Sequence, residues 1–257
     1  MLALLSGGAA LLGLLVGSFL NVVIHRVPAN ESIVHPRSRC PKCGTQLSSL
    51  DNVPVLSWLI LRGKCRTCSE PISARYPLVE LLTAVLFAAT ALRFGADAAL
   101  PAFLVLVASL VALSAIDLDT FTLPRKIIYV TAAAGLVLLG IAAVVDGDFR
   151  GMVEGIAGGA IAFTILLVIH VISPRGMGFG DVRLAGLLGL YLGWIELPLV
   201  GVGLFLSFLV ASVIGIGLML IRGRGRKERI PFGPFLAAGA LLAIWFGTPI
   251  LDAYLGR

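Results

Sequence analysis

The chain has 257 residues, of which 58% are hydrophobic and 13% charged, and its formal net charge is +6. Soluble domains average about 45–50% apolar and about 25% charged residues, so a water-soluble fold could not bury this much apolar surface. The composition excludes a soluble enzyme, a disordered scaffold and a secreted disulfide-rich module, and it predicts an all-α polytopic membrane protein. In a membrane protein an excess of positive charge first indicates the orientation of the helices and contacts with lipid headgroups. We therefore expect membrane lipids, and no nucleic acid, as partners.

Eight apolar runs bounded by charged residues are candidates to cross a bilayer, which takes about 20 residues of helix. They cover residues 2–24, 78–92, 98–116, 127–145, 152–172, 184–197, 198–221 and 232–250. The second and sixth are short, and only Glu196 and Pro198 separate the sixth from the seventh. We therefore predict about eight transmembrane helices in three parts: a first helix at 1–24, a loop domain at 25–77, and a membrane core at 78–257.

The positions of Lys and Arg predict the orientation in the membrane. If the eight spans alternate, only Arg93, Arg150 and Arg257 of the 20 Lys and Arg residues lie on one side, and the other 17 gather on the side of the 25–77 loop. By the positive-inside rule the loop is cytoplasmic and both termini lie outside. The first span has its charges after the apolar run, which favours a retained anchor over a cleaved signal peptide.

All four cysteines lie in this loop, as the pairs Cys40/Cys43 and Cys65/Cys68 with 21 residues between the pairs. Two such CxxC pairs are typical of a tetrahedral four-thiolate zinc site. Four thiolates leave no open position for water, so the zinc would be structural and would hold together a loop with few apolar residues. Two disulfides are the alternative, but they are disfavoured in the cytoplasm, where the loop is predicted to lie.

Acidic residues at the cytoplasmic membrane boundary are candidate catalytic groups. Asp117 and Asp119 follow the third span, and Asp181 opens the sixth. Two carboxylates from different helices at one depth can share a proton, which gives an acid and a base able to activate water for amide hydrolysis. Gly178 and Gly180 would let the backbone approach an extended substrate closely.

The residues leave other interpretations open. The acids could instead pair with Arg125, Lys126 or Arg183 while the glycines only form a loop. An acidic pair at this depth also suits a proton-coupled transporter. Glu80 and Glu154, near the ends of their spans, are the other acids that the predicted boundaries do not explain.

At these residues the chain resembles the type IV prepilin peptidases, membrane aspartic proteases of the GxGD class, over nearly its whole length. The resemblance rests on the cysteines, on the two acidic motifs, and on the segments 17–28, 75–80 and 230–234. In the family's register Asp117, seven residues before Pro124, matches the first catalytic aspartate, and Asp181 in Gly178-Phe179-Gly180-Asp181 matches the second. The supporting residues would be Asp119, Gly178, Gly180, Arg183 and Glu80.

The resemblance implies an endopeptidase that cleaves the basic leader of type IV prepilins and pseudopilins at the cytoplasmic face of the bacterial inner membrane. It implies a zinc loop and, for many members, N-methylation of the new N-terminus with S-adenosylmethionine. The sequence shows no separate nucleotide-binding motif, so that cofactor rests on the resemblance alone. A structural component of a pilus or secretion machine is a further alternative, which would leave the Gly178–Asp181 motif without a role.

Overall fold

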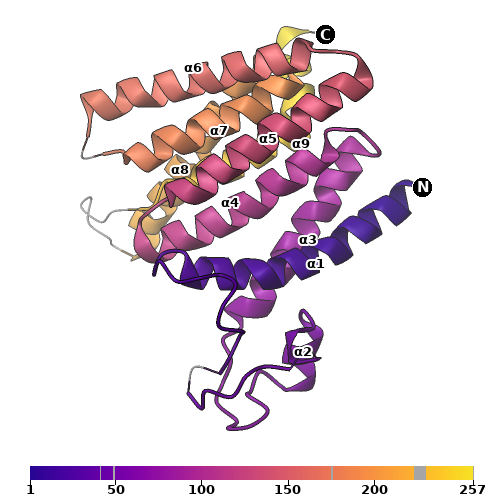
Figure 1. Cartoon of the computed structure of the whole chain (residues 1–257). Helices are drawn as coiled ribbons and strands as arrows, with labels where there is room; N and C mark the ends of the chain where they lie inside the picture. The colour runs from indigo at the N-terminus through magenta and orange to yellow at the C-terminus, as the bar shows by residue number, and fades with distance from the viewer. Residues whose placement is uncertain (41, 49, 175, 223–229, 257) are drawn as a thin grey trace. The chain divides into compact units, whose positions relative to one another are not determined.

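The computed structural model describes residues 1–40, 42–48, 50–174, 176–222 and 230–256 (Figure 1). Within these ranges the regular structure is helical, apart from two isolated β-bridges, Arg39 with Gln46 and Lys64 with Pro71. The all-α prediction is therefore confirmed. Residues 223–229, which form most of the predicted basic segment before the last span, lie outside the described residues.

Eight long helices correspond to the eight predicted spans. They are α1 (Leu2–Arg26), α3 (Arg75–Phe94), α4 (Leu100–Thr120), α5 (Arg125–Asp146), α6 (Arg150–Ile172), α7 (Phe179–Ile195), α8 (Leu199–Arg222) and α9 (Gly233–Leu255). The loop between α1 and α3 contains a 3-10 turn, η1 (Leu50–Asn52), and the short helix α2 (Leu56–Ile60). In the described part of the chain, seven of these helices are long and apolar enough to cross a membrane, and the eighth is the shorter α7.

Helix α7 differs from its prediction in both position and surroundings. The sequence placed this span at 184–197 because Asp181 and Arg183 interrupt the apolar run, but the helix begins at Phe179 and has 17 residues. It packs against α5, α6, α8 and α9, and most of its side chains from Asp181 onward are buried. A helix enclosed by other helices can carry charges in its first turn more readily than one exposed to lipid.

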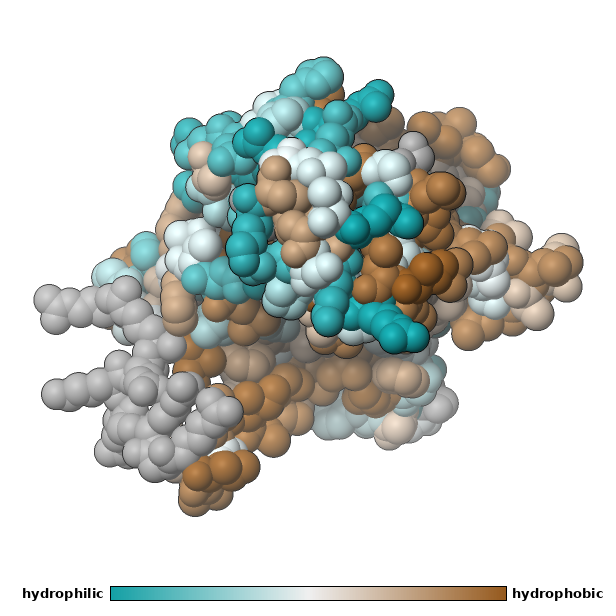
Figure 2. Space-filling model, turned by 90° about the horizontal axis from the view of Figure 1, so that it is seen from below, coloured by the Kyte–Doolittle hydropathy of each residue, from teal (hydrophilic) through white to brown (hydrophobic). Residues whose placement is uncertain are grey.

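The chain divides into two compact units. Unit 1 comprises Met1–Leu100 and Val107–Ala112, and unit 2 comprises Pro101–Leu106 and Leu113–Arg257. Within unit 1, α1 and α3 pack along each other and the cysteine loop joins them (Figure 1). Within unit 2, α6 packs extensively on α7, and α8 on α9. Hydrophilic residues gather over the cysteine loop, as Figure 2 shows.

Glycine residues allow the closest helix–helix contacts in both units. A Cβ atom added at Gly17 of α1 would lie 2.7 Å from the Cα atom of Glu80 on α3. A Cβ atom added at Gly158 of α6 would lie 2.5 Å from the carbonyl oxygen of Gly189 on α7. Lipid gives little hydrophobic drive for helix association, so close backbone contact is what holds such pairs together. Substituting either glycine would push the two backbones apart.

Candidate functional site

Asp117 and Asp119 lie in the last turns of α4 but have different environments. Helix α4 continues to Thr120, four residues past the predicted end of the span, and so contains both acids. Asp117 is 5% exposed, whereas Asp119 is on the exposed side. A helix turns by about 100° per residue, so side chains two positions apart point in different directions. The burial favours Asp117 over Asp119 as the acid of an enclosed site.

Asp117 accepts a hydrogen bond from the start of another helix. The backbone N–H of Gly233, the first residue of α9, donates to Oδ2 of Asp117 over 3.0 Å. This N–H is one of those that have no partner within their own helix, because the first turn lacks preceding carbonyls. The bond therefore supplies a partner to a buried carboxylate and to a helix terminus together.

Asp181 is the third residue of α7 and is also buried, with 8% exposure. The N–H of Gly178, the residue that caps the helix, donates to Oδ2 of Asp181 over 3.1 Å. An acid at this position commonly bonds back to the capping residue, and the positive end of the helix dipole favours a carboxylate there. The motif thus places its acid by ordinary helix-capping chemistry.

Leu123 brings the two acidic motifs together within unit 2. A Cβ atom added at Gly180 would lie 3.0 Å from Cβ of Leu123, and one added at Gly233 would lie 3.0 Å from its Cδ2. The added atom at Gly233 would also lie 2.7 Å from Oδ2 of Asp117. The end of α4 and the starts of α7 and α9 therefore meet around one leucine, so the segments that carry the two carboxylates lie together.

Sequence reasoning assigned no role to Leu123 or Gly233. Gly233 belongs to the 230–234 segment on which the family resemblance partly rests, so a signal for its importance was present. Leu123 lies in the short link of residues 121–124 between α4 and α5, and an apolar residue there gives no distinctive pattern. Both positions matter through contacts between segments that are far apart in the sequence.

For Asp117 and Asp181, the structure does not show the alternative in which the acids pair with basic side chains. Among the described residues, neither Asp117 nor Asp181 forms an ion pair with Lys or Arg. The guanidinium carbon of Arg183 lies 4.4 Å from the ring centroid of Phe179, over its face. Arg183 therefore interacts with an aromatic ring of its own helix.

The four cysteines of unit 1 form one cluster. Their Sγ atoms all lie within 4.8 Å of one another, and those of Cys40 and Cys68 are 3.7 Å apart. A zinc ion bound by four sulfurs at about 2.3 Å would hold them about 3.8 Å apart. A disulfide would need about 2.05 Å, and all four cysteines are free. The cluster fits a tetrahedral metal ion, and the donor set fits zinc.

The two cysteine pairs share one backbone arrangement. The N–H of Cys40 donates to the carbonyl of Thr45 over 2.9 Å, and the N–H of Cys65 donates to the carbonyl of Glu70 over 2.8 Å. Each turn brings both of its thiols to the same side, as a zinc knuckle requires. Lys42 of the first turn forms an ion pair with Glu70 of the second. The cluster is thus assembled from two similar local turns.

Two further contacts organise the rest of the loop. Arg66 donates from Nε and Nη2 to Oδ1 of Asp51, at 2.9 and 2.7 Å. This bidentate hydrogen bond holds the pKa of the Asp51 carboxyl below its usual value. The indole N–H of Trp58 donates to the carbonyl of Ile72 over 3.0 Å. These two contacts tie the segment 51–58 of the loop to the segment 66–72.

Glu80 binds the loop within unit 1. Its carboxylate, in a residue that is 7% exposed, accepts a hydrogen bond from the N–H of Val55 over 2.7 Å. Val55 caps α2 with a φ of +60°, which is unusual for a β-branched residue. The buried acid thus joins α3 to the start of α2.

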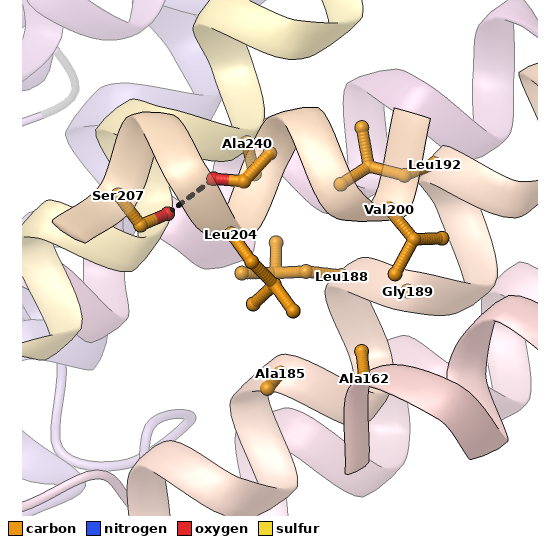
Figure 3. A pocket seen from close by; sticks show the side chains of 10 residues that line it. Ala162, Ala185, Leu188, Gly189, Leu192, Val200, Leu204, Ser207 and Ala240 are labelled. Carbon is orange, nitrogen blue, oxygen red and sulfur yellow. Dashed lines mark hydrogen bonds between the residues drawn. The ribbon is translucent and has the colours of Figure 1, made fainter. Parts of the chain in front are cut away.

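A small pocket lies between α6, α7, α8 and α9, with a cavity volume of about 10 Å³ (Figure 3). Ser207 is the only polar side chain among the residues that line it, and its hydroxyl donates to the carbonyl of Gly203 over 2.7 Å. Pockets for drug-sized ligands measure about 300–1,000 Å³ and carry several placed polar groups. This pocket does not fit S-adenosylmethionine, which is larger and charged.

These features define a polytopic α-helical membrane protein that has two buried aspartates at helix ends and a separate four-cysteine cluster. Comparison with known families gives the class a name. Residues 11–94 match the model of the bacterial peptidase A24 N-terminal domain, and residues 104–220 match that of the type IV leader peptidase family. The chain belongs to the type IV leader peptidase family.

Relatives with assigned names cover most of the chain. It is 40% identical to a prepilin leader peptidase/N-methyltransferase of Burkholderia pseudomallei, over 94% of the chain and 85% of the relative. A protein of the same name from Aeromonas hydrophila is 40% identical over 95% and 92%, and one from Myxococcus xanthus is 48% identical over 72% and 56%. No solved structure matches the chain significantly.

Proposed function

We propose that this chain is a membrane aspartic endopeptidase that removes the basic leader of type IV prepilins and pseudopilins. The observation that carries the proposal is the convergence of Asp117 and Asp181, two buried acids from different helices whose oxygens are bound by backbone N–H groups. The family membership and the names of the relatives support the substrate class.

The two carboxylates would act as one acid/base device. Close acidic groups in a partly desolvated site do not readily ionise together, so the pair holds one proton. The ionised carboxylate takes a proton from water, which attacks the scissile carbonyl, while the protonated one polarises that carbonyl. Oδ2 of each residue is bound to a backbone N–H, so we assign Oδ1 of each to water and substrate. Proton transfer to the new amine completes the cleavage.

We also propose that the site faces the cytoplasm of a bacterial inner membrane, with both chain termini outside. The support is the asymmetry of charge, because only three of the 20 Lys and Arg residues fall on the other side of the eight-helix arrangement. A basic leader would then meet the acidic pair, and the apolar helix of the substrate would stay in lipid. Alkaline phosphatase fused to the C-terminus should be active in cells, whereas no activity in a stably expressed fusion would contradict this orientation.

The zinc ion would be held by Cys40, Cys43, Cys65 and Cys68, and its chemistry there would be structural. It would crosslink the two knuckles of the loop, and it takes no part in the hydrolysis that we assign to the aspartates. N-methylation with S-adenosylmethionine is a second activity in the names of the relatives. The apolar pocket between α6 and α9 does not fit that cofactor.

Two alternatives receive less support from the geometry. A proton-coupled transporter would need ionisable groups along the middle of its helices, whereas Asp117 and Asp181 lie at helix ends. A structural component of a pilus or secretion machine would have no use for two buried acids that share a site. The decisive experiment is incubation of the purified protein with a prepilin in detergent, where release of the leader supports the peptidase and an intact prepilin contradicts it.

A further inference from the structure

The peptide group between Met177 and Gly178 is bound on both sides. Its N–H, from Gly178, donates to Oδ2 of Asp181 over 3.1 Å. Its carbonyl oxygen, from Met177, lies 2.8 Å from Nδ1 of His170. A carbonyl oxygen can only accept, so the proton of this hydrogen bond is on Nδ1 of the histidine. One planar amide therefore connects His170 to Asp181.

This connection would fix the orientation of the peptide group. Gly176 and Gly178 flank Met177, and glycine torsions restrict rotation of a peptide less than those of other residues do. Rotation of this peptide would turn its N–H away from Asp181 and leave the carboxylate without that donor. A hydrogen bond to the carbonyl prevents the rotation, and it also strengthens the N–H as a donor because hydrogen bonds in series polarise one another.

His170 is itself held in place by neighbouring rings. It lies in the last turn of α6, and its ring is tilted against Phe179 of α7 at a centroid distance of 5.6 Å. Phe179 also contacts Phe163 of α6, edge to face at 6.4 Å, and Arg183 lies over its ring. The imidazole is thus oriented by the extensive packing of α6 on α7.

We propose that His170 is a positioning residue for Asp181, acting through the Met177–Gly178 peptide. Its Nδ1–H holds that peptide so that the N–H of Gly178 keeps the Asp181 carboxylate in its reactive orientation. Substrate binding does not depend on this contact, whereas the catalytic step does. The inference rests on the proposed peptidase function, because it assigns a role in that reaction.

Two substitutions separate positioning from packing. His170→Asn keeps an N–H donor near the place of Nδ1 but loses the ring, whereas His170→Leu keeps apolar volume and loses the donor. Positioning predicts that His170→Leu lowers kcat of leader cleavage about tenfold with KM unchanged, as expected for one lost hydrogen bond, and that His170→Asn stays within about threefold of the wild type. A packing role predicts the opposite order.

Wild type and Asp181→Asn are assayed in parallel with a purified prepilin in detergent. If the wild-type protein leaves the prepilin intact, the proposed function fails. If it cleaves, the inference alone is overturned by a His170→Leu variant with wild-type kcat, by a loss confined to KM, or by His170→Asn being no faster than His170→Leu. His170→Phe provides a second donor-free variant that keeps a ring against Phe179, and it should show the same loss of kcat if His170→Leu does not fold.

Discussion

The cysteine loop of unit 1 and the aspartate site of unit 2 are assembled in different ways. The four thiols come from two similar turns, and the first and last of these cysteines, Cys40 and Cys68, are only 28 residues apart. Each turn is shaped by its own backbone hydrogen bonds. The carboxylates come from α4 and α7, and the donor to Asp117 lies 116 residues further along the chain, at the start of α9. A local turn forms whenever its own residues allow it, whereas the aspartate site exists only when three helices have packed.

The comparison predicts that substitutions act differently in the two regions. Loss of an aspartate removes a reacting group without disturbing the fold, because Asn has nearly the volume of Asp. Loss of a cysteine removes a crosslink and leaves the reacting groups in place.

Asp117→Asn and Asp181→Asn should each lower kcat of prepilin cleavage by at least about 100-fold, because either change removes half of one acid/base device. The double variant should be no worse than the single ones, since the losses do not add. Asp119→Asn, at the exposed neighbouring position, is the matched control and should stay within a few-fold of wild type. Full cleavage by Asp181→Asn would exclude the peptidase mechanism, and an inactive Asp119→Asn with a normal Asp117→Asn would move the first acid by two residues.

Gly233→Ala should lower activity by about 10- to 100-fold, since a misplacement of about 1 Å at a reacting group has effects of this size. The added Cβ would lie 2.7 Å from Oδ2 of Asp117, so the carboxylate or α9 must shift. Gly201→Ala in α8 is the control, because nothing lies within 4 Å of its added Cβ. Steady-state cleavage rates compare the two, and equal rates would mean that the Gly233 contact does not position Asp117.

Removal of the metal should reduce stability more than catalysis. Elemental analysis should find one zinc per chain, and Cys40→Ser or a strong chelator should lower the thermal midpoint because a four-thiolate ion contributes to folding of its loop. Cleavage should fall only in part. Complete loss of cleavage in a metal-free protein that is still folded would mean that the loop takes part in the reaction.

The smallest effect concerns the ion pair of Asp51 with Arg66. The pKa of Asp51 is lowered in the folded loop, so the pair stabilises the fold above the usual Asp value of about 3.9 and loses this effect as pH falls through the lower folded value. Thermal unfolding at pH 7 should show Asp51→Asn less stable than wild type by about 1 kcal/mol or less. The difference should shrink as the pH falls toward the lowered folded-state pKa of Asp51. A gap that is the same at pH 7 and at pH 3 would assign the effect to something other than charge.

Most of the long helices could be predicted from the pattern of apolar residues, but the start of α7 could not. Every long helix contains most of a predicted apolar run, because lipid demands a long apolar stretch from any helix that it surrounds. Helix α7 is enclosed by four other helices and starts at Phe179, with Asp181 and Arg183 in its first turns. Charge is tolerated there because backbone donors and an aromatic ring replace water.

The sequence by itself determined the membrane class, the all-α fold and the cysteine cluster, since these depend on composition and on residues close together in the chain. It also pointed to Asp117 and Asp181 through their motifs. Only the tertiary structure decided that Asp117 is buried and Asp119 exposed, that Gly233 and Leu123 complete the site, and that His170 reaches the Met177 carbonyl. These features depend on how separate helices pack. A contact between two distant segments produces no recognisable residue pattern in the sequence of either segment.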